Sequence, residues 1–164
     1  MVVLRVASLV VLSLWIGGLA VLGFVAAPVI FRTLEAQDAA GGRALAGLVF
    51  GAVFARFQDW AWVLGAALIM LLATRALLGP RPRRLGWRLL TVVGMLALSL
   101  YTAFGIAPRI DRIRTDTAGS VSSLPDSDPR KQEFGRLHGL SNVIMLVTLL
   151  GGVGLIWIET TDSH

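Results

Sequence analysis

Four apolar stretches divide the chain, and each is long enough to cross a lipid bilayer. They are Val6–Ala27, Trp60–Leu78, Trp87–Ala107 and Leu140–Ile158. A membrane-spanning helix needs about 20 mainly apolar residues. Because backbone polar groups inside lipid must be hydrogen-bonded within the protein, these stretches are predicted to be helices. The alternating pattern of a membrane β-barrel is absent. The predicted fold is therefore an all-α integral membrane protein, a single four-helix bundle over residues 1–164.

The composition supports a membrane protein and excludes several other classes. Hydrophobic residues make up 55% of the chain and the mean hydropathy is +0.75, which is too apolar for an ordinary soluble domain. The absence of cysteine excludes disulfides and thiol chemistry. The net charge is +5, and fourteen of the fifteen basic residues are arginine. We interpret this charge as flanking the spans. No nucleic-acid-binding motif is present, so the expected partner is the bilayer and not nucleic acid.

Two segments of the chain recur after eighty residues. Ala27–Arg32 resembles Ala107–Arg112, and Phe54–Gln58 resembles Phe134–His138. This offset predicts a parallel internal repeat, in which hairpins of about residues 1–80 and 81–160 superpose about an axis near the membrane normal.

The apolar pattern continues past the spans on one side of the membrane. The second helix is predicted to run from about Gly42 to Leu78, longer than the bilayer needs. The first helix is expected to continue beyond Pro28 and the third beyond Pro108, with a bend at each proline. Asp128-Pro129 predicts the start of the fourth helix. The tail from Glu159 to His164 is predicted to be frayed.

The connection between the second and third spans is basic and contains no acid. Its arginines are Arg75, Arg81, Arg83, Arg84 and Arg88. Because short basic loops stay in the cytoplasm, this loop and both termini are predicted to be cytoplasmic, in the inner (plasma) membrane. A reporter fused after Pro82 is therefore expected to be active only if it is of a cytoplasmic type.

Polar residues gather near the opposite ends of the spans. His138, Ser141 and Asn142 share one helical face, and the repeat places Gln58 and Asp59 across the axis from them. We expect His138 to face inward and to hydrogen-bond to another helix. Polar groups at membrane depth are candidates for function, but the sequence favours a polar clamp that holds the two hairpins together over a catalytic site. The candidate cluster consists of Arg32, Arg56, Gln58, Asp59, Arg112, Arg136, His138, Ser141 and Asn142.

The residues offer few ligands for a metal or cofactor. His138 and Met145 are seven residues apart and could hold a soft ion such as Cu(I), and His138 could bind one side of a haem. No set of nucleophile, base and orienting group is visible, so the sequence favours a protein that is not an enzyme. The small residues Gly47, Gly51 and Ala55 form a ridge, which predicts close helix packing within the bundle or in a homodimer.

Several motifs resemble those of a known family. Trp15-Ile16-Gly17-Gly18, the stretch Phe24–Phe31, and the F-x-x-L-H-x-x-S pattern of Phe134–Ser141 resemble the transmembrane-protein-205-like family. The resemblance implies a small four-helix integral membrane protein of uncharacterised function. More distantly, the layout is similar to the membrane domain of copper-resistance D proteins and to four-helix protoporphyrinogen oxidases. The latter use histidine-ligated haem, whereas here the first helix contains no histidine.

These features lead to one functional hypothesis and two alternatives. The leading hypothesis is a non-enzymatic binding or accessory subunit of a membrane complex, with its polar site at the non-cytoplasmic end. The alternatives are a protein that handles or transports copper or another small ion, and a haem-dependent membrane oxidoreductase.

Overall fold

The protein is a bundle of four long helical rods. The computed structural model describes residues 2–39, 41–79, 84–117 and 121–161, and this part of the chain contains no strand. Four helical segments within it are long and apolar enough to cross a membrane, so the predicted four-helix membrane fold is confirmed. The elements are α1 (Val2–Val21), η1 (Leu22–Ala26), α2 (Ala27–Gln37), α3 (Gly42–Leu78), α4 (Leu85–Tyr101), η2 (Thr102–Ile106), α5 (Ala107–Asp116), η3 (Val121–Ser123) and α6 (Pro129–Thr161).

The rods are longer than a bilayer requires. The helix α3 has 37 residues, which at about 1.5 Å per residue gives roughly 55 Å. The hydrocarbon core of a bilayer is about 30 Å thick. The predicted bounds of this helix, Gly42–Leu78, agree with the structure. The bundle therefore extends beyond the lipid core.

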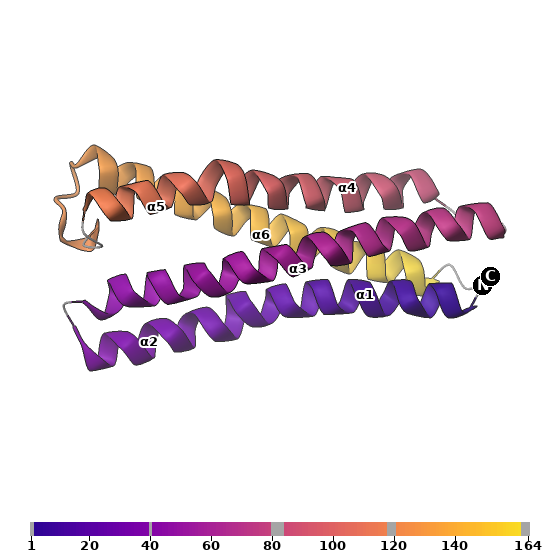
Figure 1. The fold of residues 1–164 in the computed structure, drawn as a ribbon, viewed down its shortest axis with the longest axis horizontal. Helices are drawn as coiled ribbons and strands as arrows, with labels where there is room; N and C mark the ends of the chain where they lie inside the picture. The colour runs from indigo at the N-terminus through magenta and orange to yellow at the C-terminus, as the bar shows by residue number, and fades with distance from the viewer. Residues whose placement is uncertain (1, 40, 80–83, 118–120, 162–164) are drawn as a thin grey trace.

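The two ends of the bundle differ in which elements meet there. Both chain termini lie at one end, where α1 begins and α6 ends, and we call this the terminal end (Figure 1). At the opposite end α2 and α5 finish, and α3 and α6 begin. We call this the far end.

The helices form a closed ring in the terminal half of the bundle. There α1 packs against α3 and α6, and α4 packs against the same two helices. The main hydrophobic core lies inside this ring and includes Leu12, Trp15, Leu68, Met95 and Leu155.

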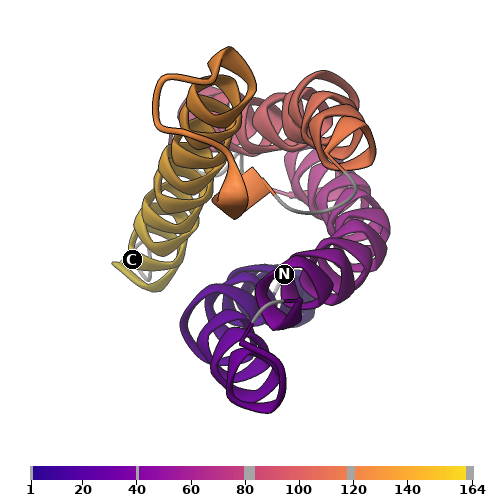
Figure 2. The same ribbon diagram turned by 90° about the vertical axis from the view of Figure 1, so that its left-hand side faces the viewer.

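The bundle divides into two arms in the far half. The helix α2 packs mainly against α3, and α5 packs against α6, so that the far end has an α2–α3 arm and an α5–α6 arm (Figure 2). A second, smaller core belongs to the α5–α6 arm and its adjoining turns, with Ile106, Ile113, Val121, Leu137 and Ile144. In contrast, α2 has no fully buried residue.

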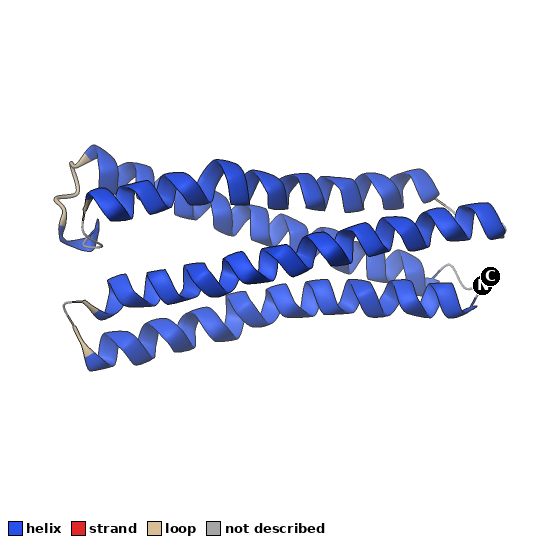
Figure 3. Ribbon diagram, in the orientation of Figure 1, coloured by secondary structure: helices blue, strands red, loops and turns tan. Residues whose placement is uncertain are grey.

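A π-helical turn precedes each of the two prolines at which a bend is predicted. Both η1 and η2 are five-residue π-helices, and each is followed by an Ala-Pro pair, at Pro28 and Pro108. A proline lacks an N–H and crowds the carbonyl four residues earlier, and a wider turn accommodates this. The rod remains helical through both turns (Figure 3). The two π-helices are eighty residues apart.

The burial pattern follows the same offset. Buried positions of α1 include Ser8, Leu12, Trp15 and Leu19. Eighty residues later, the buried positions of α4 are Arg88, Val92, Met95 and Ser99. This register agrees with the predicted internal repeat. That the two hairpins superpose about an axis along the membrane normal stays a prediction.

The fourth rod begins where the sequence predicts and ends later. Asp128 precedes Pro129, and its Oδ1 accepts a hydrogen bond from the Arg130 N–H at 2.8 Å, which caps α6. The Arg130 side chain also bonds this carboxylate and holds the pKa of Asp128 below its usual value. The prediction that the tail frays from Glu159 is wrong as far as Thr161, since α6 continues to that residue and Glu159 is buried. The rest of the predicted tail, 162–164, lies outside the described residues.

Candidate functional site

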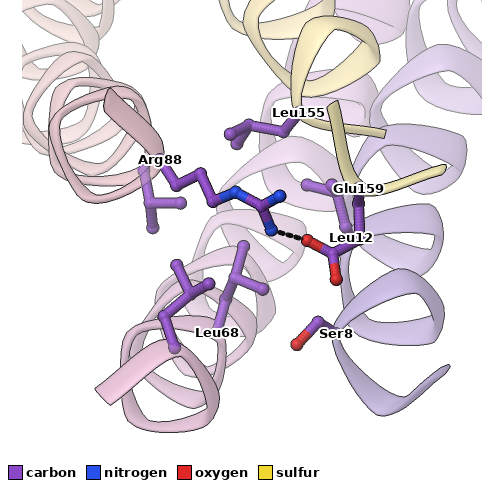
Figure 4. A pocket seen from close by; sticks show the side chains of 8 residues that line it. Ser8, Leu12, Leu68, Arg88, Leu155 and Glu159 are labelled. Carbon is purple, nitrogen blue, oxygen red and sulfur yellow. Dashed lines mark hydrogen bonds and ion pairs between the residues drawn. The ribbon is translucent and has the colours of Figure 1, made fainter. Parts of the chain in front are cut away.

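A buried ionic cluster closes the terminal end. Its centre is Glu159 of α6, which is only 5% exposed. One carboxylate oxygen accepts a hydrogen bond from Arg75 of α3, and the other accepts one from Arg88 of α4, as Figure 4 shows for Arg88. Arg5 of α1 completes the cluster, with its Nε 4.0 Å from Glu159 Oε1. Each of the four rods thus contributes one charged side chain, and we call this group the Glu159 cluster.

Arg5 also caps the end of α6. Its Nη2 donates hydrogen bonds to the carbonyls of Glu159, at 2.6 Å, and Thr160, at 3.1 Å. The last carbonyls of a helix have no partner within the helix, so the arginine satisfies groups that would otherwise need water. Because a buried charge is costly unless it is paired, the cluster fixes the relative positions of the four rods at this end.

The space beside this cluster is small. A cavity of about 10 Å³ lies among Ser8, Arg88, Glu159 and apolar side chains that include Leu12 and Leu68 (Figure 4). This volume is at the lower limit for a single water molecule. The space beside the Glu159 cluster therefore holds at most about one water molecule.

Gln58 forms a second buried polar contact nearer the middle of the bundle. Its Nε2 donates to the carbonyl oxygen of Ser99, at 3.2 Å, and to the Ser99 hydroxyl oxygen, at 2.9 Å. The indole N–H of Trp62 donates to the same hydroxyl oxygen at 3.0 Å. Gln58 and Trp62 lie on α3, and Ser99 lies on α4, so this contact joins the two hairpins.

Most of the predicted polar cluster does not assemble. Arg56 and Asp59 form an exposed pair at 3.4 Å, spaced as neighbours on one helix. The arginines Arg32, Arg112 and Arg136 are exposed. Within the described residues, none of these three makes a hydrogen bond or an ion pair. From different helices, the described members of the cluster that come together are Gln58 and Ser141, which line the same cavity.

His138 does not lie where the helical face predicts. Its side chain is exposed, as is Asn142. Its ring stacks on Phe134 of the preceding turn, with centroids 6.1 Å apart and planes at 4°. Within the part of the chain that the structure describes, His138 makes no hydrogen bond to another helix. The expected inward-facing contact with Gln58 or Asp59 is absent there, because Gln58 turns to Ser99 instead. Whether His138 or its neighbours bind a ligand stays a prediction.

Arg114 makes a contact between helices that the sequence analysis did not predict. Its guanidinium lies against Gly47 and Gly51 of α3, where a Cβ at Gly47 would be only 2.8 Å from Nη2. It also lies over the Phe134 ring, 5.7 Å from the centroid, and 3.8 Å from Asp111 Oδ1. The glycine ridge thus receives an arginine from the other arm. The sequence feature that could have predicted this contact is the pair of glycines, Gly47 and Gly51, on one helix together with an arginine near the end of another.

The two candidate metal ligands, His138 and Met145, lie in different environments. Met145 packs against Gly23 and lines the same cavity as Gln58 and Ser141, whereas His138 is exposed. Within the described residues, no group of three or more His, Cys, Asp or Glu side chains gathers in one place.

Comparison with known proteins gives one family. The sequence model of the family described as "Domain of unknown function (DUF4149)" matches residues 10–118, more than half of the chain. No curated protein and no solved structure matches. The match does not bear on the likeness to the transmembrane-protein-205-like family, to copper-resistance D proteins or to protoporphyrinogen oxidases, which stays a resemblance.

Proposed function

The chain belongs to the DUF4149 family of unknown function, and we propose that it is a non-enzymatic accessory protein of the membrane that holds a partner protein at its far end. The observation that carries this proposal is the contrast between the two ends of the bundle. The terminal end is locked by the Glu159 cluster, and the far end divides into two arms.

The structure of the arms supports a binding role. The α5–α6 arm has its own small core, while α2 has no fully buried residue and leaves large side chains such as Val29 exposed. A helix with an unburied apolar face needs lipid or protein to cover it. The exposed arginines Arg32, Arg112 and Arg136 lie on the same arms and offer charged contacts at the edge of such an interface.

The proposed orientation places this end outside the cytoplasm. The arginines between α3 and α4, such as Arg84, favour a cytoplasmic terminal end; Arg81 and Arg83 lie outside the described residues. The protein would then sit in the inner (plasma) membrane with both termini in the cytoplasm, and the far end would meet partners on the opposite side.

The test is purification of the full chain from native membranes in mild detergent. We expect a partner protein in stoichiometric amount, and we expect Arg114→Ala to reduce its retention several-fold, because Arg114 is the side chain that reaches from α5 to Gly47 and Gly51 of the other arm. Arg109→Ala, an exposed arginine on the same helix, is the matched control and should retain the partner. A Soret band or stoichiometric copper without any partner would instead favour the haem or copper alternative and would overturn the proposal.

A further inference from the structure

A second cavity lies inside the bundle, between its two ends. It has a volume of about 20 Å³. Its lining is contributed by α1, α3, α4, η2 and α6. The polar residues among them are Gln58, Ser99, Thr102, Ser141 and Thr148.

The Ser99 hydroxyl oxygen accepts two hydrogen bonds, and its own O–H can still donate one. Its hydroxyl oxygen accepts from Gln58 Nε2 and from Trp62 Nε1. A serine hydroxyl has two acceptor lone pairs and one O–H donor, so both lone pairs are used. A helical hydroxyl commonly donates to the carbonyl four residues earlier, as Thr102 and Thr148 do at 3.0 Å and 2.9 Å. In the described residues Ser99 donates no such bond. Its O–H is available to the cavity that it lines.

Two further groups at this cavity can also hydrogen-bond to an occupant: the amide oxygen of Gln58 and the hydroxyl of Ser141. The Ser99 carbonyl can only accept, which fixes the orientation of the Gln58 amide with Nε2 toward it. The amide oxygen Oε1 is then an acceptor, and the structure shows no donor to it among the described residues. Ser141 also lines the cavity, and its hydroxyl makes no hydrogen bond within the same described ranges.

We propose that this cavity is a binding site for one water molecule, held by Ser99, Gln58 and Ser141. The occupant must both accept, from the Ser99 O–H, and donate, to Gln58 Oε1. A cavity of this size holds one water, and a buried water needs two to four polar partners. The polar lining has no carboxylate to balance a cation at membrane depth. The water completes a hydrogen-bond network that links Gln58 of α3, Ser99 of α4 and Ser141 of α6, beside the π-helix η2.

A pair of substitutions at Ser141 distinguishes a hydrated cavity from a dry one. Ser141→Ala removes the hydroxyl without filling the space. Ser141→Val replaces the hydroxyl by one methyl group and adds a second, which reduces the space for a water in this small cavity. Expelling the water leaves the Ser99 O–H and Gln58 Oε1 unpaired, so we expect the Val variant to unfold at least about 4 °C below the Ala variant. In a dry cavity the added methyl gains contacts, and the Val variant would be the more stable of the two.

The control and a direct measurement complete the test. Val147→Ala, on the exposed face of α6, measures the intrinsic difference between Ala and Val in this helix. In the wild-type protein we expect magnetisation transfer in NMR spectra from water to the side-chain amide protons of Gln58, and loss of that transfer in Ser141→Val. A Val variant as stable as Ser141→Ala after this correction, or wild-type protein without the water signal, would overturn the proposal.

Discussion

Glu159→Gln is expected to lower the thermal unfolding midpoint of the detergent-solubilised protein by on the order of 10 °C. The substitution preserves shape and removes the negative charge that Arg5, Arg75 and Arg88 share. Breaking a buried ion pair by removing one partner costs about 3–5 kcal/mol, because the other charges stay buried. In a protein of this size each kcal/mol corresponds to roughly 2–4 °C.

The control for this variant lies on the same helix. Glu133 is an exposed carboxylate near the start of α6, so Glu133→Gln is expected to shift the midpoint by no more than about 1 °C. Equal midpoints for the two variants would show that the Glu159 cluster does not lock the terminal end.

The second large effect is expected from Gly152→Ala, which brings α1 and α6 into conflict. A Cβ at Gly152 would overlap Cδ1 and Cγ1 of Ile16, and Ile16 is itself buried. Overpacking of this kind costs about 1–3 kcal/mol. We therefore expect an unfolding midpoint several degrees below that of the wild type.

A glycine-to-alanine substitution two residues later, at Gly154, should not destabilise the protein. A Cβ at Gly154 would meet nothing within 4 Å, and alanine is the better helix former by about 1 kcal/mol. Gly154→Ala is therefore expected to leave stability unchanged or to raise it. If both alanine variants melt together, the close contact between α1 and α6 is not present in the folded protein.

The sequence predicts the rods well because their signals are local. The apolar lengths identify the four spans, and the bounds of α3 and the start of α6 at Pro129 follow from the pattern and the Asp-Pro cap. The form of the helix at the two prolines was harder to predict from the sequence. Proline predicts a bend, but the sequence did not predict that the turn before each proline is π-helical.

The site residues were harder to predict because their roles depend on which helix faces which. Glu159 stands in a polar tail and Arg88 in a basic connection, so each resembles a solvent-exposed charge until the bundle brings them together. Conversely, His138 shares a helical face with Ser141 and Asn142, yet its ring stacks along its own helix on Phe134.

We propose that partners bind at the far end, while the Glu159 cluster holds the four rods together at the terminal end. The most direct test is photo-crosslinking in native membranes, with a photoreactive residue placed singly at Val29 or Arg112 on the two arms and at Leu77 near the terminal end. All three positions are exposed. We expect the same protein adduct from both far-end positions and none from Leu77. An adduct from Leu77 alone, or crosslinks to lipid only at all three positions, would contradict this account.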